Sequence, residues 1–253
     1  MNLANRLRIA RRQIPEVDSS RFYPQVASCQ IPPLAFLYER FLGQTSNGFF
    51  VEVGGYDGKF VSNSWGLAEA GWGGLIVEPN PEMVLECRRT HEQHPDVSVV
   101  EVAAGPPGLG SIVLNTAGTL TTANTHLFEE YKSVAWAKKE LKHSKKLAVP
   151  CMTLNEILAG CSRLDQIDVL IVDVEGFESE VFQGFDLARW RPRMIIVELV
   201  NTHPDLTSTS HSDSVLQSHI ARNGYQVAYK DQINTVFVVE ELWLTKPADQ
   251  LGK

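Results

Sequence analysis

The chain has 253 residues, of which 43% are hydrophobic, and its formal net charge is −7. This length and composition suit one domain with a substantial apolar core. The negative net charge argues against a general nucleic-acid-binding protein, because such proteins gain most of their affinity from cationic contacts with phosphate. No apolar run reaches the roughly 18 residues of a membrane span, and no apolar segment of the signal-peptide type follows the N-terminal arginines. We therefore expect no transmembrane segment and a cytoplasmic location.

The four cysteines are widely spaced and include no C-x-x-C pair. A structural zinc site favours closer pairs, and disulfide frameworks occur mainly in shorter secreted chains. We therefore expect reduced thiols, as in a cytosolic protein.

The first 45 residues predict a helical extension before the main fold. Residues 1–20 are basic and amphipathic, which favours a surface helix and leaves contact with an anionic membrane surface or an acidic partner as the alternative. Two prolines then precede a predicted helix at Leu34–Leu42, which Gly43 ends. We expect residues 1–253 to form a single domain whose core covers residues 46–245.

An apolar run at Phe49–Val53 leads directly into a turn rich in glycine. The run predicts a buried parallel strand, and the glycines allow the backbone to pass close under a ligand. We expect the end of this strand and the turn to bind a cofactor through Glu52, Gly54, Gly55, Tyr56, Asp57 and Gly58.

The charge of the turn indicates which cofactor binds. A dinucleotide site needs the spacing G-x-G-x-x-G, whereas the glycines here follow G-G-x-x-G. Glu52 and Asp57 would repel a pyrophosphate but suit the amino group and sulfonium of S-adenosylmethionine. The turn therefore favours S-adenosylmethionine, and a nicotinamide-dependent oxidoreductase is the alternative.

A second strand, predicted at Gly74–Val77, also ends in an acidic residue, Glu78, which is followed by Pro79. Glu78 stands 20 residues after Gly58. In nucleotide-binding α/β sheets, an acid at about this distance accepts hydrogen bonds from ribose hydroxyls. We therefore expect Glu78 to bind the ribose of the cofactor.

The rest of the chain continues the alternation of helices and strands. We expect helices at Ser62–Ala70, Glu82–Glu92, Thr153–Leu158 and Ser214–Arg222, and strands at Val97–Val102, Val149–Met152, Ile167–Val174 and Pro192–Val200. Gln226–Lys230 and Thr235–Val239 predict a closing hairpin. The pattern predicts an α/β fold with a mostly parallel sheet, helices on both faces and a C-terminal antiparallel hairpin.

An insertion at about residues 106–148 interrupts this alternation. It begins with a strand at Ser111–Leu114, one arm of an added hairpin, and continues as a polar and then lysine-rich stretch. A long polar insertion before a catalytic strand often builds a lid or a substrate wall. The lysines favour a solvated helix face, and recruitment of an anionic substrate is the alternative.

Several blocks of the sequence resemble the FkbM-type S-adenosylmethionine-dependent methyltransferases. They are FVEVGGYDG, GLIVEPNP, VSVVEVAAG, VPCMTLNEIL, IDVLIVDVEGFESEVFQGFD and RPRMIIVELV, in family order from about Phe49 to about Asn201. The most specific is the D-x-E-G block, Asp173–Gly176. The resemblance implies a Rossmann-like class I methyltransferase domain, with Ala103 beside the adenine of the cofactor. It also implies O-methylation of a hydroxyl on a sugar, a glycan or a secondary metabolite.

Acidic residues follow several predicted strands, and the carboxyl ends of parallel strands share one edge of a sheet. We expect Glu52, Glu78, Asp173, Glu175 and Glu198 to surround one crevice. An oxygen acceptor needs a general base, for which Asp173 and Glu175 are our candidates and His203 the alternative. A magnesium site formed by Asp173, Glu198 and Asn201 is a less favoured possibility.

The chain departs from the family at Ile171, where many members carry a lysine. This departure motivates a third hypothesis, a non-catalytic module that binds S-adenosylmethionine. The acceptor, as a small molecule or glycan, and the oligomeric state are not predicted further by the sequence.

Overall fold

The computed structural model describes residues 22–161, 166–199, 206 and 210–244. The basic segment at residues 1–20, Asn201 and His203 lie outside the described residues. Among the residues that are described, no helix is long and apolar enough to cross a membrane.

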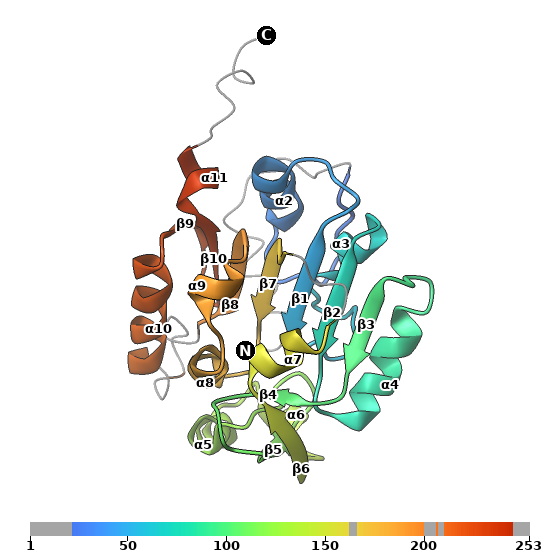
Figure 1. Ribbon diagram of the computed structural model, residues 1–253. Helices are drawn as coiled ribbons and strands as arrows, with labels where there is room; N and C mark the ends of the chain where they lie inside the picture. Colours follow the sequence, from blue (N-terminus) through green and yellow to red (C-terminus); the bar gives the residue numbers. More distant parts are fainter. Residues whose placement is uncertain (1–21, 162–165, 200–205, 207–209, 245–253) are drawn as a thin grey trace.

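A seven-stranded sheet forms the centre of the fold (Figure 1), in the order β3-β2-β1-β7-β8-β10-β9. The first five strands in this order are parallel, and β10 is antiparallel to both β8 and β9. The predicted α/β fold with a C-terminal antiparallel hairpin is therefore confirmed. The strands are β1 Phe49–Val53, β2 Gly73–Val77, β3 Val97–Val100, β7 Val169–Val172, β8 Met194–Glu198, β9 Tyr225–Lys230 and β10 Asn234–Val239.

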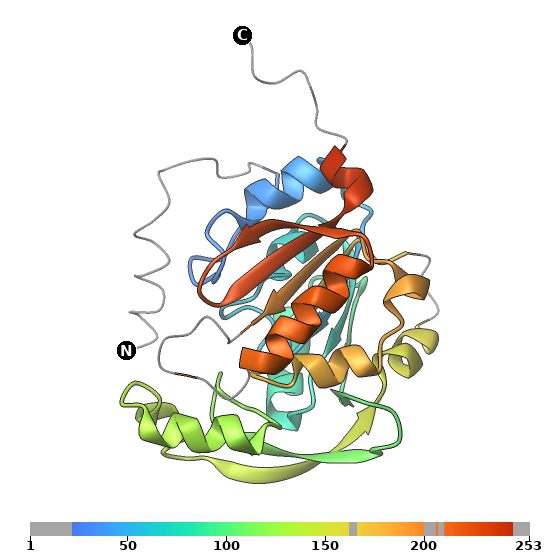
Figure 2. The same cartoon turned by 90° about the vertical axis from the view of Figure 1, so that its left-hand side faces the viewer.

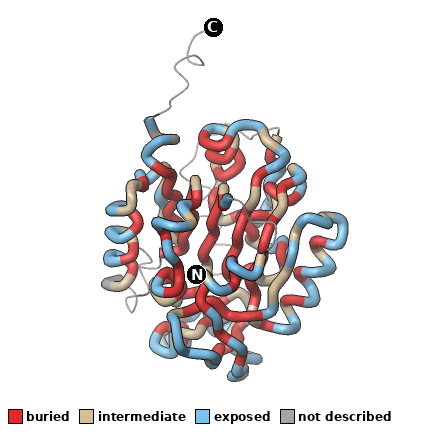
Figure 3. The backbone as a smooth tube through the Cα atoms, in the orientation of Figure 1, coloured by how far each residue is buried: buried red, intermediate tan, exposed pale blue. Residues whose placement is uncertain are grey.

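Helices cover both faces of this sheet because side chains alternate along the buried strands. On one face, Val51 and Val172 belong to an apolar cluster with residues of α7, α8, α9 and α10. On the other face, Phe50 and Ile171 belong to a cluster with residues of α2 and α3 and with Cys87 of α4. Figure 3 shows buried residues along the central strands, between the two helical layers. The helices are α2 Leu34–Leu42, α3 Trp65–Glu69, α4 Pro81–Thr90, α7 Leu154–Ala159, α8 Glu178–Gln183, α9 Leu187–Trp190, α10 Ser210–Arg222 and α11 Glu240–Leu244.

The first crossover helix is shorter than the prediction of Ser62–Ala70. The helix begins only at Trp65, after a tight turn that the Ser62 amide closes on the Lys59 carbonyl and in which Val61 has a φ of 55°. The Ser62 hydroxyl accepts hydrogen bonds from the amides of Ser64 and Trp65, so these amides are satisfied by a side chain before α3 begins.

The insertion builds a second, smaller sheet beyond the carboxyl ends of the central strands (Figures 1 and 2). Its order is β4-β6-β5, with β6 parallel to β4 and antiparallel to β5. The added strand predicted at Ser111–Leu114 is present as β5, whereas β6 begins four residues before the predicted Val149. The elements are β4 Ala103–Ala104, β5 Ser111–Thr116, α5 Thr125–Ser133, α6 Lys138–Leu141 and β6 Lys145–Met152.

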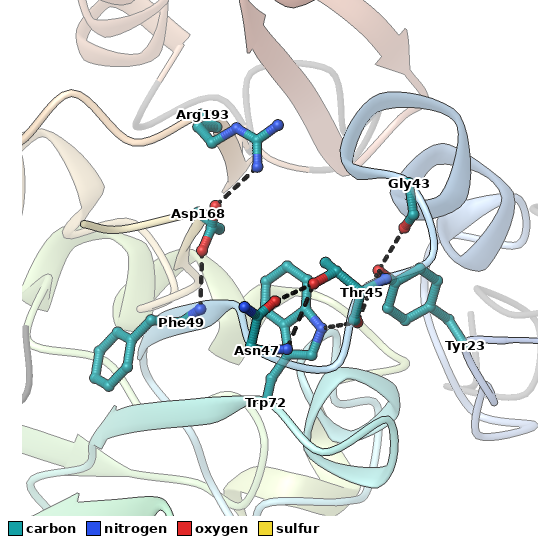
Figure 4. Close-up of polar contacts among 8 residues, drawn as sticks. All are labelled: Tyr23, Gly43, Thr45, Asn47, Phe49, Trp72, Asp168 and Arg193. Carbon is teal, nitrogen blue, oxygen red and sulfur yellow. Dashed lines mark hydrogen bonds and ion pairs between the residues drawn. The ribbon is translucent and has the colours of Figure 1, made fainter. Parts of the chain in front are cut away.

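A polar network closes the opposite, amino-terminal edge of the sheet (Figure 4). Asp168 accepts a hydrogen bond from the Phe49 amide at 2.9 Å and forms an ion pair with Arg193 at 3.0 Å. Nearby, the indole N–H of Trp72 donates to the Thr45 carbonyl at 2.6 Å. This edge anchors the start of β1 and leaves the carboxyl edge for a ligand.

Candidate active site

A pocket opens at the carboxyl ends of β1, β2 and β7, where the insertion faces the central sheet. Residues after these strands form one side, and Gln30 and the insertion form the other. The lining residues are Gln30, Gly54, Tyr56, Val61, Glu78, Pro79, Asn80, Met83, Ala103, Ala104, Ile112, Leu114, Gly118, Thr119, Thr121, Ala123, Asp173, Val174, Glu175 and Phe177.

The structure brings together most, but not all, of the site residues expected from the sequence. Seven line the pocket: Gly54, Tyr56, Glu78, Pro79, Ala103, Asp173 and Glu175. Five other described candidates do not line it: Glu52, Gly55, Asp57, Gly58 and Glu198.

Glu78 is fixed at the end of β2 by two backbone hydrogen bonds. One carboxylate oxygen accepts from the Tyr56 amide at 2.9 Å, and the other accepts from the Asn80 amide at 2.8 Å. Burial raises the pKa of Glu78 to about 7, although both hydrogen bonds lower it. Each carboxylate oxygen keeps a further lone pair, so Glu78 can also accept hydrogen bonds from a ligand.

Gly54 allows the glycine turn to pass against the D-x-E-G block. Its φ is 92°, and a Cβ at this position would lie 1.8 Å from the Asp173 carbonyl oxygen. Tyr56 also has a positive φ, 49°, which directs its amide to Glu78. Gly54 therefore sets the contact between the two strand ends that form the floor of the pocket.

Glu52 lies beneath this turn, inside the fold. Its carboxylate accepts a hydrogen bond from the Ser64 hydroxyl at 2.7 Å. Burial raises the pKa of Glu52 to about 8, and the nearby Asp173 also raises it. Glu52 is therefore mainly protonated at neutral pH and does not offer a negative charge to the pocket.

The remaining turn candidates have structural contacts. The Asp57 carboxylate accepts from the amides of Lys59 and Phe60, at 2.9 and 2.7 Å. The Gly58 carbonyl lies 3.2 Å from Nε2 of His91, at the end of α4. A Cβ at Gly55 would lie 2.1 Å from the Ile76 side chain, so this glycine permits packing.

The D-x-E-G block turns sharply after β7, with positive φ at Glu175 (53°) and Gly176 (87°). From α8, the buried Glu178 carboxylate accepts hydrogen bonds from the amides of Val174 and Gly176, at 3.0 and 3.1 Å. Burial raises the pKa of Glu178 well above its usual value. From the insertion, the Tyr131 hydroxyl donates to Oε2 of Glu175.

Three carboxylates next to the pocket have the composition of a cation site. Asp173, Glu175 and Glu198 each offer one oxygen, and these oxygens lie within 4.8 Å of one another. Such a set could hold a hard divalent cation. The magnesium site predicted from the sequence does not include Glu175. Its third predicted ligand, Asn201, lies outside the described residues.

Several residues of the site had no assignment from the sequence. Gln30, Thr119 and Thr121 line the pocket. Tyr131 does not line it but donates a hydrogen bond to Glu175. Their only sequence signal is the polar composition of the insertion, which does not indicate which side chains face inward.

The charge of the lining is negative. Glu78, Asp173 and Glu175 are acidic, and no lysine or arginine is among the described lining residues. In the insertion, Lys132 pairs with Glu129 and Lys145 pairs with Glu82, all on exposed surfaces. These two contacts agree with the solvated face expected for the lysine-rich stretch.

Comparison with solved structures finds methyltransferases of low sequence identity. The METTL16 methyltransferase domain is 12% identical, with a TM-score of 0.46, over 86% of this chain and 73% of its own. Precorrin-6y C5,15-methyltransferase from Geobacter metallireducens GS-15 is 11% identical, with a TM-score of 0.43, over 88% of this chain and 93% of its own. The O-methyltransferase TomG from Streptomyces achromogenes, solved with S-adenosylmethionine, is 13% identical, with a TM-score of 0.43, over 94% of this chain and 88% of its own.

Comparison with curated proteins finds no match. A family model, however, covers more than half of the chain: the methyltransferase FkbM domain matches residues 52–227. This range contains the glycine turn, Glu78, the insertion and the D-x-E-G block. The chain belongs to the FkbM methyltransferase family.

Proposed function

We propose that the protein transfers a methyl group from S-adenosylmethionine to a hydroxyl oxygen of an uncharged, polyhydroxylated acceptor. A sugar or glycan is the first candidate, and a hydroxylated secondary metabolite is the second. The observation that carries the proposal is that one pocket joins Glu78 to Asp173 and Glu175. The family match supports methyl transfer as the reaction.

The residues at the ends of β1 and β2 fit the cofactor. Glu78 is oriented to accept hydrogen bonds from ribose hydroxyls, and the small side chains of Ala103 and Ala104 leave room for a flat ring. The acidic lining suits a sulfonium and an amino group and disfavours a pyrophosphate. The nicotinamide alternative loses its support, because the family match is to methyltransferases.

Asp173 and Glu175 are the proposed catalytic pair. Bound S-adenosylmethionine supplies a methyl group activated by a positively charged sulfur. One carboxylate accepts the proton of the acceptor hydroxyl, and the other accepts a hydrogen bond that orients the hydroxyl. Holding the oxygen in line with the methyl group supplies much of the rate, because the reactants no longer have to meet by diffusion. His203 remains an alternative base by prediction.

The proposed class of acceptor follows from the lining. Gln30, Thr119 and Thr121 can donate and accept hydrogen bonds, as hydroxyl groups require. A phosphate or carboxylate on the acceptor would lie near three carboxyl groups without a cation among the described lining residues. An uncharged acceptor avoids this repulsion.

The lysine that many family members carry is replaced here by Ile171, a change compatible with activity. Ile171 is buried in the apolar cluster beneath the sheet and does not line the pocket. It stands in register with Glu52, so a lysine there would lie beside a buried acid. The substitution therefore removes no side chain from the acceptor side of the pocket.

The first test is calorimetric titration of the protein with S-adenosylmethionine and with its demethylated product, each with and without magnesium. We expect both ligands to bind in the micromolar range. Failure of both to bind would overturn the proposal. A difference in affinity between the titrations with and without magnesium would show whether Asp173, Glu175 and Glu198 hold a cation that assists cofactor binding.

A second test measures transfer of radiolabelled methyl groups to two matched acceptor panels. One panel contains neutral methyl glycosides and polyols, and the other contains the corresponding sugar phosphates and uronic acids. We expect products only from the neutral panel. Cofactor binding without transfer to either panel would favour the non-catalytic module.

A further inference from the structure

The backbone at Glu175 is held in a conformation that a glutamate rarely adopts. Its φ of 53° lies in the left-handed region, which costs a non-glycine residue about 1 kcal/mol or more. Such strain persists only where surrounding contacts fix it, and it is common at functional sites. The contacts that fix Glu175 therefore indicate the function of this backbone conformation.

Three of these contacts come from the insertion, which is distant in sequence. The Thr122 hydroxyl donates to the Glu175 carbonyl at 2.6 Å, and the Asn124 amide group donates to the Gly176 carbonyl at 2.9 Å. The Tyr131 hydroxyl donates to the Glu175 carboxylate. Backbone and side chain of Glu175 are thus both held by one segment.

Asn124 connects these hydrogen bonds to the start of α5. Its side-chain oxygen accepts hydrogen bonds from the amides of His126 and Leu127, at 3.1 and 3.0 Å, and so caps the helix. The nitrogen of the same side chain binds Gly176. The helix that carries Tyr131 is therefore placed relative to the D-x-E-G block by the residue that begins it.

The phenol ring of Tyr131 is itself immobilised. Tyr131 is fully buried in an apolar cluster with Leu127 and Phe128, and its ring packs edge-on against Trp136 with centroids 5.9 Å apart. Tyr131 does not line the pocket, whereas Glu175 does. The described contact through which the tyrosine reaches the pocket is therefore its hydrogen bond to Glu175.

We propose that Tyr131 is a positioning residue that orients the Glu175 carboxylate toward the acceptor hydroxyl. The proposal rests on the function proposed above. A carboxylate can accept several hydrogen bonds at once, so a hydrogen bond from Tyr131 is compatible with another from the acceptor hydroxyl.

The test compares Tyr131→Phe with a matched control, Tyr225→Phe. Tyr225 is also buried, and its hydroxyl donates to the Pro192 carbonyl at 2.7 Å, away from the pocket. Both variants lose one hydroxyl and keep the ring. For Tyr131→Phe we expect kcat to fall by about 10- to 100-fold and the KM for S-adenosylmethionine to change less than about twofold. Tyr225→Phe should leave both kinetic constants close to those of the wild type, because its hydroxyl lies away from the pocket.

A readout without an acceptor separates this proposal from the proposed function. We expect calorimetry to give the wild type, Tyr131→Phe and Tyr225→Phe similar affinities for S-adenosylmethionine, because neither tyrosine lines the pocket. Wild-type turnover in Tyr131→Phe would overturn the role of Tyr131, even if the wild type is an active methyltransferase. Failure of the wild type to bind S-adenosylmethionine would instead overturn the proposed function.

A double variant distinguishes an effect of Tyr131 through Glu175 from a general structural effect of the substitution. In the Glu175→Gln background, Tyr131→Phe should cost no further activity, because the two side chains act as one unit. Equal losses in both backgrounds would overturn the proposal, since Tyr131 would then act independently of Glu175.

Discussion

Glu52 and Glu78 end neighbouring strands, yet their surroundings give them different chemistry. Glu78 lines the pocket and accepts two backbone hydrogen bonds, whereas Glu52 lies under the turn and binds Ser64. Register places Glu52 opposite Ile76, which belongs to an apolar cluster of the core. Glu78 stands two residues beyond Ile76, after the end of β2, so it lies at the pocket whereas Glu52 lies within the sheet.

Replacing Glu78 by alanine should weaken binding of S-adenosylmethionine. The loss of hydrogen bonds to ribose hydroxyls is expected to cost about 1 to 3 kcal/mol, or roughly 5- to 150-fold in Kd. Calorimetry measures this change directly. Glu82→Ala is the control, since Glu82 is exposed and forms an ion pair with Lys145 at the surface. Equal affinities of both variants and the wild type would remove Glu78 from the site.

Replacing Glu52 by glutamine should change how stability depends on pH. The pKa of Glu52 rises from 4.5 to about 8 on folding, so the folded state binds the proton more tightly. Its stabilising effect is complete below about pH 4.5 and is lost as the pH rises through about 8, at up to about 1.4 kcal/mol per pH unit. Glutamine has no such dependence. Urea unfolding at pH 5 and pH 8 should therefore show a smaller loss of stability for Glu52→Gln than for the wild type.

The control for this pH effect is Glu101→Gln, because Glu101 is exposed. Its unfolding free energy should follow the wild type at both pH values. The same pH dependence in Glu52→Gln and in the wild type would show that Glu52 is ionised in the folded protein.

The sequence predicts part of the site for a simple physical reason. Gly54, Glu78 and Asp173 follow parallel strands, and such strands end at one edge, so their meeting in one pocket follows from the pattern. Tyr131 and Gln30 reach the site through the packing of distant segments, which periodicity does not encode. Thr122 and Asn124 likewise act on the D-x-E-G block from 52 or 53 residues away.

Elements were predictable where local chemistry is strong. The helix predicted at Thr153–Leu158 is present as α7, and Thr153 and Glu156 exchange hydrogen bonds in a capping box at its start. The central strands are mostly apolar, as is typical of a parallel sheet buried on both faces. In the insertion, α5 has a weaker signal, an Asn124 cap with Leu127 and Tyr131 four residues apart, amid polar residues.

At the level of elements, the junction between β1 and β7 depends on the absence of a side chain at Gly54. Gly54→Ala would place a methyl group 1.8 Å from the Asp173 carbonyl, at a φ of 92°. Gly108→Ala is a matched control, since Gly108 has a φ of 86° but nothing within 4 Å. We expect the free energy of unfolding to fall by about 1 to 2 kcal/mol in Gly108→Ala and by about 3 kcal/mol or more in Gly54→Ala.

Urea unfolding measures both costs, and calorimetry measures the effect on the pocket. Gly54→Ala should also weaken binding of S-adenosylmethionine, because relief of the clash moves Asp173 or the turn. Equal costs for the two variants would mean that only the backbone conformation matters at Gly54.

For the whole molecule, the segment before β1 is part of the core although the family match begins at residue 52. Ile31 and the α2 residues Leu34 and Leu37 are buried against the sheet. The Tyr38 hydroxyl donates to the Asn63 carbonyl at 2.8 Å, next to the glycine turn, and Gln30 lines the pocket. A parallel sheet needs both faces covered, so this segment completes the fold and one wall of the site.

Removing residues 1–44 should therefore abolish cooperative folding, because it exposes the apolar face formed by Phe50, Ile76 and Ile171. Thermal unfolding followed by circular dichroism, together with size-exclusion chromatography, measures the outcome as loss of a sharp transition and as aggregation. Tyr38→Phe in the full chain is the comparison, since it deletes only one hydrogen bond and should cost about 1 kcal/mol. If residues 45–253 remain monomeric and melt cooperatively near the wild-type temperature, the covering of this face is dispensable. In that case the matched region alone contains enough of the core to fold.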